Sequence, residues 1–201
     1  MVTRLKRSGT KYTYQDYVTW SDDERWEIID GEAYNMTPAP STLHQRISRE
    51  LLRQFANYLI EKTCEVFAAP YDVIIDGDKE NSQNIVQPDL LVVCDKKKLE
   101  SGKYCLGAPD LIIEILSPST AKKDLLTKRK LYEKFGVKEY WIADPENKDI
   151  TVFILQKDDK YSEPRIYPTE EKVTPSLFPD LHIDQQLVYR EYKYKFSKTK
   201  V

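Results

Sequence analysis

The stretch APDLIIEILSPSTAKKDLLTKRKLYEKFG, residues 108–136, joins an apolar run to a basic segment and decides the fold. The run at residues 111–116 ends at Ser117-Pro118, and its composition predicts a strand that is buried on both faces. Glu114 lies inside this run. An ionised carboxylate is costly to bury unless it is paired, hydrogen-bonded or bound to a metal, so Glu114 is a candidate functional residue.

A second apolar run contains the same kind of exception. Residues 85–93 carry Asp89 directly after Pro88, and proline suits the start of a strand. Asp89 therefore stands at the head of a second predicted strand. It is the second candidate residue.

The segment that follows Ser117-Pro118 is predicted to be an α-helix. Its buried stripe is expected to contain Leu125, Leu131, Tyr132 and Phe135. At about 100° per residue, Lys128 falls near the centre of this stripe and Asp124 at its margin. The same spacing directs the remaining lysines away from the stripe: Lys122, Lys123, Lys130 and Lys134. One lysine and two carboxylates are thus expected to face an apolar interior, which suggests a site.

Length and composition limit the class of protein. The 201 residues are expected to form one domain, with a core from about residue 13 to 183 and loose tails at both ends. The formal net charge of −2 weighs against passive coating of nucleic acid and leaves only local basic patches. Cys64, Cys94 and Cys105 lack metal-ligand spacing and predict reduced thiols, as in a cytoplasmic protein. No apolar stretch approaches the length of a membrane span.

The other patterns predict an α/β fold. An N-terminal β-hairpin is expected at residues 25–36, turning at Asp30-Gly31, and a long helix from residue 41 to about 62, with His44 in line with its apolar stripe. Further strands are expected at residues 64–75, 85–94 and 139–143, with a peripheral hairpin at 150–155 and 160–166. Residues 111–143 form a strand–helix–strand unit, which predicts parallel pairing. The predicted architecture is a mixed central sheet flanked by helices, with the extra N-terminal β-hairpin.

Several sequence blocks occur in an order that resembles the Uma-two family. These blocks are WEIIDGE at residues 26–32, Pro40-Ser41 with His44, Gln87-Pro88-Asp89, PDLIIEILSPST at residues 109–120, Asp124, Lys128, Tyr132, Gly136-Val137 and Glu139-Tyr140-Trp141. Each block alone is a weak signal, but the ordered set, from about residue 13 to 144, is specific. The family is identified as endonuclease-like, within the PD-(D/E)XK, restriction-endonuclease-like superfamily.

The resemblance implies a nuclease core in which Asp89 and Glu114 bind a divalent metal. One departure is that the superfamily lysine is absent two residues after Glu114, where Leu116 stands. The resemblance suggests that Lys128 in the next helix takes its place, a position that the stripe geometry also favours.

The expected metal is Mg²⁺ or Mn²⁺. Mg²⁺ prefers carboxylate and water oxygens and is often held by only one or two carboxylates. Lys128 is expected to orient or help deprotonate the attacking water and to offset charge on the phosphate. Glu27 matches the family's early acid and is expected to bind metal directly or through water. His44 matches the family's histidine and is expected to contact phosphate or hold a ligand in place. Nearby basic residues are candidates for contact with DNA phosphates: Lys96, Lys97, Lys98, Lys122, Lys123, Arg129 and Lys130.

Each assignment has a structural alternative. Asp89 and Glu114 can be explained as partners of buried basic groups, and Lys128 as a lysine that extends from the stripe to water. His44 can be a core or capping residue, and Glu27 a partner of Arg25 or a charge at a sheet edge. The lysine runs can be solvated surface, and Asp124 can simply pair with Lys128 at i,i+4 spacing.

Two functions from different classes follow. The first is a cytoplasmic, metal-dependent endonuclease that hydrolyses phosphodiester bonds in DNA, with catalytic residues Asp89, Glu114, Lys128, Glu27 and His44, and with a homodimer as a way to cut both strands. The second is a catalytically silent binding or scaffold protein with the same fold. Retention of both acids and the stripe lysine favours the enzyme, whereas Leu116 and the acidic pI favour the scaffold.

Overall fold

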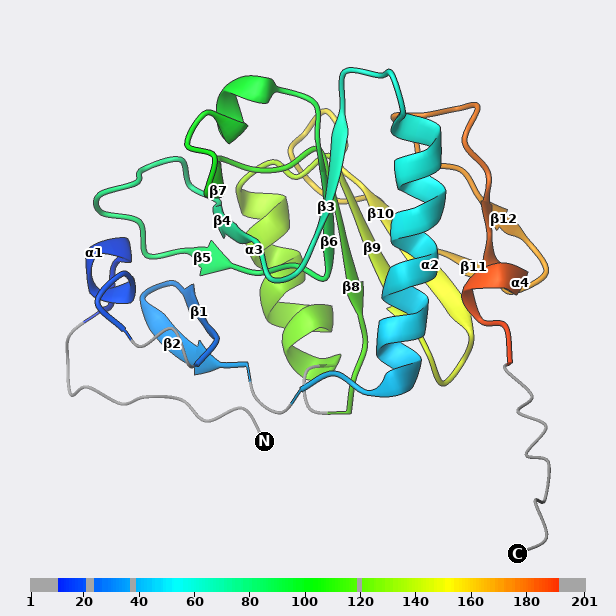
Figure 1. Cartoon of the computed structure of the whole chain (residues 1–201), viewed down its shortest axis with the longest axis horizontal. Helices are drawn as coiled ribbons and strands as arrows, with labels where there is room; N and C mark the ends of the chain where they lie inside the picture. Colours follow the sequence, from blue (N-terminus) through cyan, green and yellow to red (C-terminus); the bar gives the residue numbers. More distant parts are fainter. Residues whose placement is uncertain (1–10, 21–23, 37–38, 119–120, 192–201) are drawn as a thin grey trace, which may run out of the picture.

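A six-stranded sheet runs through the middle of the molecule (Figure 1). The computed structural model describes residues 11–20, 24–36, 39–118 and 121–191. The strands, in spatial order, are β11 (Arg165–Pro168), β10 (Asp149–Ile154), β9 (Glu139–Asp144), β8 (Leu111–Ile115), β6 (Leu90–Val93) and β3 (Glu65–Ala68). β8 and β9 are parallel and the other neighbours are antiparallel, so the predicted mixed sheet is confirmed.

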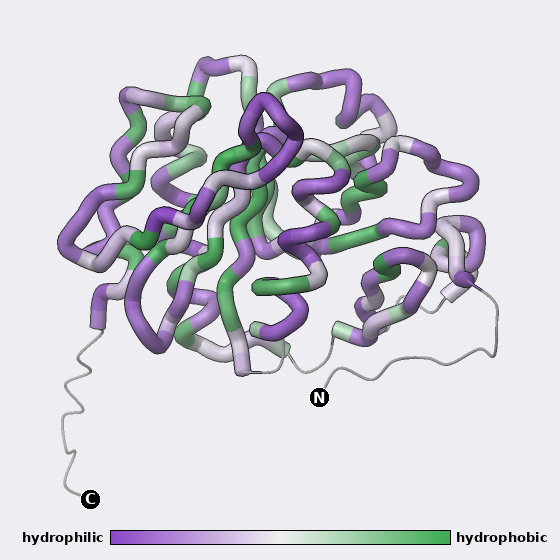
Figure 2. Tube along the Cα trace, turned by 180° about the vertical axis from the view of Figure 1, so that it is seen from behind, coloured by the Kyte–Doolittle hydropathy of each residue, from purple (hydrophilic) through white to green (hydrophobic). Residues whose placement is uncertain are grey.

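β8 separates two hydrophobic cores. All five of its residues are buried, as the apolar run predicts. Leu111, Ile113 and Ile115 pack in the core that contains α2 (Thr42–Leu59), whereas Ile112 packs with α3 (Arg129–Lys134) in the core of the other face. In Figure 2 the strands in the middle of the molecule are coloured largely as hydrophobic. Glu114 points to the face that Ile112 shares with α3, because side chains alternate along a strand.

A second, five-stranded sheet packs over the α3 face. Its order is β2 (Glu32–Asn35), β1 (Trp26–Ile29), β5 (Ile85–Val86), β4 (Asp72–Ile74) and β7 (Tyr104–Leu106). The predicted hairpin is confirmed as β1 and β2, and both turn residues, Asp30 and Gly31, have positive φ, as a type I′ turn requires.

The predicted continuous strands at residues 64–75 and 85–94 were wrong, because each divides between the two sheets. β3 and β6 belong to the larger sheet, while β4 and β5 belong to the smaller one. Pro70 and Pro88 lie at the two breaks, and proline cannot donate a ladder hydrogen bond.

The segment after β8 also differs from the prediction. It begins α-helical at residues 121–122, is π-helical in η2 (Lys123–Lys128) and returns to α-helix in α3. Leu125 is 41% exposed instead of buried, while Leu131 and Tyr132 are buried as predicted. The changed helical register has a direct consequence for the site.

The smaller elements complete the described chain. They are α1 (Tyr14–Tyr17), the 3-10 helix η1 (Lys96–Leu99), the two-stranded pair β12 (Lys172–Val173) and β13 (Ile183–Asp184), and α4 (Gln185–Val188). Val188 and Tyr189 pack in the core of the α2 face, beyond the predicted core end near residue 183. Residues 1–10 and 192–201, where loose tails were expected, lie outside the described residues.

The prediction of three reduced thiols was wrong for two of the cysteines. Cys64 and Cys94 form a disulfide, and Cys105 is free and buried. The register that pairs Glu65 with Val93 places the two cysteines opposite each other, a relation that their spacing in sequence does not reveal. Within the described part of the chain, no helix is long and apolar enough to cross a membrane.

Candidate active site

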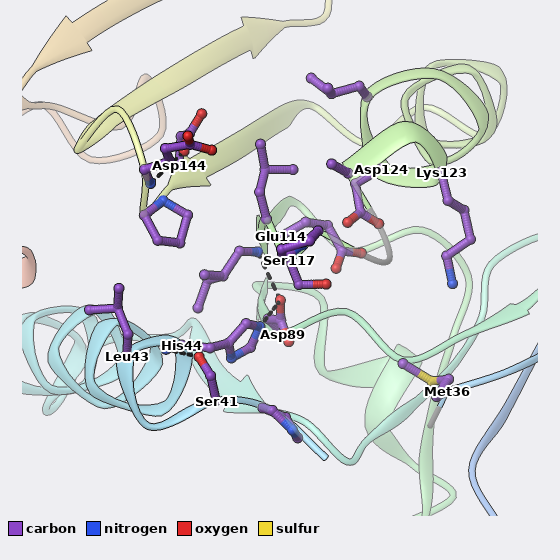
Figure 3. A pocket seen from close by; sticks show the side chains of 18 of the residues that line it. Met36, Ser41, Leu43, His44, Asp89, Glu114, Ser117, Lys123, Asp124 and Asp144 are labelled. Atoms are coloured by element: carbon purple, nitrogen blue, oxygen red, sulfur yellow. Dashed lines mark hydrogen bonds and ion pairs between the residues drawn. The ribbon is translucent and has the colours of Figure 1, made fainter. Parts of the chain in front are cut away.

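A cavity of about 690 Å³ opens where the first turn of α2, the end of β8 and η2 meet (Figure 3). The cavity is mainly apolar, but many of its lining side chains are ionisable. These are Arg25, His44, Asp89, Glu114, Lys123, Asp124, Lys128, Asp144 and Glu146. Leu116 also lines the cavity, at the position where the superfamily lysine was absent from the sequence.

Glu114 is held by the helical segment across from β8. Its Oε1 accepts hydrogen bonds from Lys128 Nζ at 2.9 Å and from the Tyr132 hydroxyl at 2.6 Å. Burial raises the pKa of Glu114 to about 8. Lys128 opposes this rise, whereas repulsion from Asp124, Asp89 and Glu27 adds to it. The carboxyl group is therefore held in a water-poor position that favours its neutral form.

Lys128 is the cation at the centre of this arrangement. Its side chain is 2% exposed, and its Nζ lies 2.7 Å from Glu27 Oε1 and 3.9 Å from Asp124 Oδ1, in addition to its contact with Glu114. Burial alone would lower the pKa of Lys128, but Glu114, Glu27 and Asp124 raise it well above its ordinary value. The alternative that Lys128 extends to water is wrong, and the i,i+4 proximity of Asp124 is confirmed.

Glu27 joins the second sheet to the site. It is completely buried on β1, and it accepts hydrogen bonds from Lys123 Nζ at 2.6 Å and from the Gln87 amide at 3.0 Å. Burial favours the neutral acid, but Lys128 and Lys123 overcome this effect and lower the pKa of Glu27 to about 2. Neither alternative for Glu27 holds, because its partners are these two lysines instead of Arg25 and its strand lies between β2 and β5.

The π-helix explains why Lys123 enters the site. The sequence predicted that Lys123 points away, since residues five apart in an α-helix are about 140° apart around the axis. A π-helix closes i→i+5 hydrogen bonds, so Lys123 and Lys128 come onto the same side of η2. The prediction for Lys123 was therefore wrong, and its side chain is only 11% exposed.

Asp89 lies on the open side of the cavity. Its Oδ2 accepts a hydrogen bond from the Ile115 amide at 2.8 Å and lies 3.1 Å from His44 Nε2 (Figure 3). The β6–β8 register pairs Leu90 with Ile113, and its continuation places Asp89 opposite Glu114 on the same face. The two acids therefore converge on one cavity, as the sequence predicted.

His44 reaches Asp89 from the first turn of α2. Ser41 caps this helix and accepts a hydrogen bond from the His44 amide at 3.2 Å. The other ring nitrogen, Nδ1, is buried without a hydrogen-bond partner in the described structure. His44 thus contacts a candidate metal ligand, which is compatible with the predicted role of holding that ligand in place.

The donor set of the two acids fits a Mg²⁺ or Mn²⁺ ion. Each carboxylate uses one oxygen within the protein, and among the described residues Asp89 Oδ1 and Glu114 Oε2 have no hydrogen-bond partner. Neither oxygen is among the fully buried atoms that lack a partner, so both retain some accessible surface. Among the described residues, no group of three or more acidic, histidine or cysteine side chains is placed so that it could hold one ion, so water would complete the coordination of an ion at the two acids.

Most of the other basic candidates lie away from the cavity. Lys96 pairs with Glu65, Lys98 donates to the Ala108 carbonyl, and Arg129 lies over the Phe153 ring. Lys97, Lys122 and Lys130 do not line it either, and only Lys123 of that group does.

Sequence reasoning missed three residues around the site. Lys123 was assigned to the wrong side, Tyr132 was assigned only to the core, and Gln87 was given no role. The Gln87 side chain connects Arg25 to Asp72 and Tyr17. The Gln87 backbone amide donates a hydrogen bond to Glu27. Two signals were available: Tyr132 follows Lys128 by four residues, which places the two on one helical face, and Gln87 and Tyr132 both belong to the blocks that resemble the Uma-two family.

Comparisons with known proteins show the family and the fold of the chain. Residues 14–186 match the Uma2 family, which is described as "Putative restriction endonuclease". An uncharacterised protein from Synechocystis sp. is 33% identical over 124 residues, which make up 61% of this chain and 62% of that protein. The match thus spans less than two thirds of the relative's own length.

A solved structure shares the fold. The crystal structure of a "putative nuclease" from Anabaena variabilis superposes with a TM-score of 0.71 and covers 89% of this chain and 97% of its own. The sequence identity is 19%, so this likeness shows the mixed α/β fold and nothing further.

Proposed function

Because the chain belongs to the Uma2 family, we propose that it is a metal-dependent endonuclease that hydrolyses phosphodiester bonds in DNA. The observation that carries the proposal is the convergence of Asp89 and Glu114 from neighbouring strands on one cavity that the buried Lys128 also lines. Carboxylates and an amine are the groups that phosphodiester hydrolysis requires, to hold a metal and to offset phosphate charge.

The proposed roles follow from the contacts. Asp89 and Glu114 would hold Mg²⁺ or Mn²⁺, and the bound ion would supply positive charge beside the phosphate. Lys128 presents an ammonium group next to Glu114, where it can offset charge on the phosphate and orient the attacking water. His44 fixes the Asp89 carboxylate, and Glu27 fixes Lys128 from the second sheet.

A plasmid-nicking assay tests this function. Wild-type protein is expected to nick supercoiled DNA with Mg²⁺ or Mn²⁺ and not with a chelator present. Glu114→Gln and Asp89→Asn keep the shape of each side chain and are expected to lower the rate at least about 100-fold. Glu163→Gln is the matched control because Glu163 is exposed and does not line the cavity, and its rate should equal that of wild type.

Calorimetry of Mn²⁺ binding measures the metal site independently of DNA hydrolysis. Both cavity variants should bind Mn²⁺ more weakly than wild type and Glu163→Gln. Nicking that survives in Glu114→Gln, or Mn²⁺ binding that is unchanged in both variants, would contradict the proposal.

One observation favours the alternative of a catalytically silent scaffold. Glu114 Oε1 already accepts hydrogen bonds from Lys128 and Tyr132, so the acid has protein partners that do not depend on a metal. A scaffold predicts no metal-dependent nicking by wild type and an unchanged or raised free energy of unfolding in Glu114→Gln.

For the enzyme, a homodimer would present one site to each strand of a duplex. The molecular mass in solution tests that arrangement.

A further inference from the structure

A smaller cavity of about 200 Å³ extends the candidate active site along α2. The two cavities share Arg25, Pro40, His44 and Asp89, so they meet at the open side of the site. Ligand pockets usually measure about 300–1,000 Å³, so the smaller cavity suits a single chemical group better than a whole nucleotide.

The two cavities differ in charge. The larger one is lined by more acids than basic residues: Asp89, Glu114, Asp124, Asp144 and Glu146 against Arg25, Lys123 and Lys128. The smaller one has Asp89 as its only acid among the described residues, and it is lined by Arg25 and Arg49 together with the polar side chains of His44, Gln45 and Ser48. An anion would therefore be stabilised in the smaller cavity, beside the place where a cation would be stabilised in the larger one.

Arg25 is oriented toward the shared boundary by Gln87. Its Nε donates to Gln87 Oε1 at 2.9 Å, and the Gln87 amide group in turn donates to Asp72 Oδ1 at 2.8 Å and to the Tyr17 hydroxyl at 3.1 Å. Asp72 and Tyr17 therefore fix which end of the Gln87 side chain faces Arg25. Gln87 is 7% exposed, so this support is rigid.

The remaining side-chain donors of Arg25 are not used by any residue that the structure describes. Its two Nη groups have no hydrogen-bond partner among the described residues, while its Nε is used by Gln87. A guanidinium group with an anchored Nε and unused Nη groups is suited to hydrogen bonding with two oxygens of a phosphate.

We propose that Arg25 and the smaller cavity bind the backbone phosphate next to the one that is hydrolysed. This inference rests on the proposed nuclease function and assigns a substrate-binding residue to it. The phosphate at the cleavage position would lie by Asp89 and Glu114, and its neighbour would occupy the arginine-lined cavity. Arg25 is then a binding residue that sets the position of the strand.

The test is binding of a fluorescein-labelled DNA duplex, measured by anisotropy over a series of salt concentrations in a chelator. Arg25→Met keeps the aliphatic stem and removes the donors, so affinity should fall roughly tenfold or more. The slope of log affinity against log salt should become shallower by about 0.9, the value for one phosphate contact. Arg25→Lys keeps the positive charge but loses the two parallel donors of the guanidinium group. Its salt slope should match that of wild type, and its affinity should lie between those of wild type and Arg25→Met.

Arg165→Met is the matched control. Arg165 is exposed on β11, and three strands separate β11 from β6. The DNA affinity of Arg165→Met and its salt slope should equal those of wild type. Thermal melting checks that each variant is folded. If Arg25→Met does not fold, the affinity of Arg25→Lys is compared with that of wild type instead. In the nicking assay, Arg25→Met should raise KM more than it lowers kcat.

The outcomes separate this inference from the proposed function. Equal affinity and slope in Arg25→Met and Arg165→Met would overturn the phosphate subsite, even if Glu114-dependent nicking is observed. Binding that depends on Arg25 in a protein that never nicks DNA would support the subsite and overturn the hydrolysis.

Discussion

The inner and outer parts of the candidate site hold their carboxylates in different ways. The inner cluster, formed by Glu27, Glu114, Lys123 and Lys128, has side chains that are between 0 and 11% exposed. The outer pair, Asp89 and His44, has side chains that are 20 and 12% exposed. Both parts pair acids with basic groups, but the Asp89 carboxylate keeps more contact with water than the carboxyl groups of Glu27 and Glu114.

This difference separates stability from function. Ions in the inner cluster have lost most of their hydration, so each depends on its partners inside the protein. The Asp89 carboxylate keeps part of its hydration, so its pairing with His44 contributes less to the free energy of folding. We therefore expect substitutions in the inner cluster to lower stability and substitutions in the outer pair to affect mainly metal binding and activity.

The largest expected effect is that of Lys128→Met. This change removes the only ammonium group that contacts both Glu27 and Glu114 in the described structure, and it leaves the ionised Glu27 carboxylate buried with less compensation. Breaking a buried ion pair on one side typically costs about 3–5 kcal/mol of folding free energy. Urea denaturation at neutral pH measures this loss of folding free energy.

Lys130→Met is the matched control for this prediction. Lys130 lies two residues along the same helical segment and is exposed, so its substitution should change the free energy of unfolding by less than about 0.5 kcal/mol. Equal effects of the two substitutions would show that the inner cluster does not depend on its central lysine.

A smaller, pH-dependent effect is expected for Glu27→Gln. The pKa of Glu27 is about 2 in the folded protein, against an ordinary value of 4.5. Its ionised form therefore stabilises the fold above about pH 4.5, and this contribution is lost as the pH falls toward 2. The difference in free energy of unfolding between wild type and Glu27→Gln should be largest near neutral pH and shrink in acid, as a pH series of urea denaturations would show. A difference that stays constant down to pH 3 would contradict the assigned charge state.

The sequence predicted the acids better than the lysines around them. Glu114 and Asp89 interrupt apolar runs, so each could be identified as a candidate from the pattern alone, whereas their convergence depends on the β6–β8 register. Lys128 could be placed inside by α-helical spacing. Lys123 could not be placed inside in the same way, because the π-helical turn in η2 changes the helical register. The sequence of η2, KDLLTK, contains no pattern that predicts a π-helix. We infer that the tertiary partner, the buried Glu27, is what favours this inward position.

The same limit applies to the fold. The hairpin at Asp30-Gly31 was predictable because the turn residues accept positive φ, and both adopt it. The division of residues 64–94 between two sheets was not, because strand propensity does not say which neighbour a strand will pair with. The disulfide depends on that pairing, since Cys64 and Cys94 meet only across β3 and β6.

The smallest expected change in stability, and the sharpest contrast with the inner cluster, is that of Asp89→Asn. The amide oxygen of asparagine can still accept the hydrogen bond from the Ile115 amide, so no backbone group is left without a partner. The contact with His44 Nε2 is partly exposed, so weakening it should cost less than about 1 kcal/mol in urea denaturation. Mn²⁺ affinity should nevertheless fall, since a neutral amide replaces one of the two carboxylates that face the cavity. A loss of stability as large as that of Lys128→Met would mean that Asp89 is a structural ion like those of the inner cluster, and the distinction between the two parts of the site would fail.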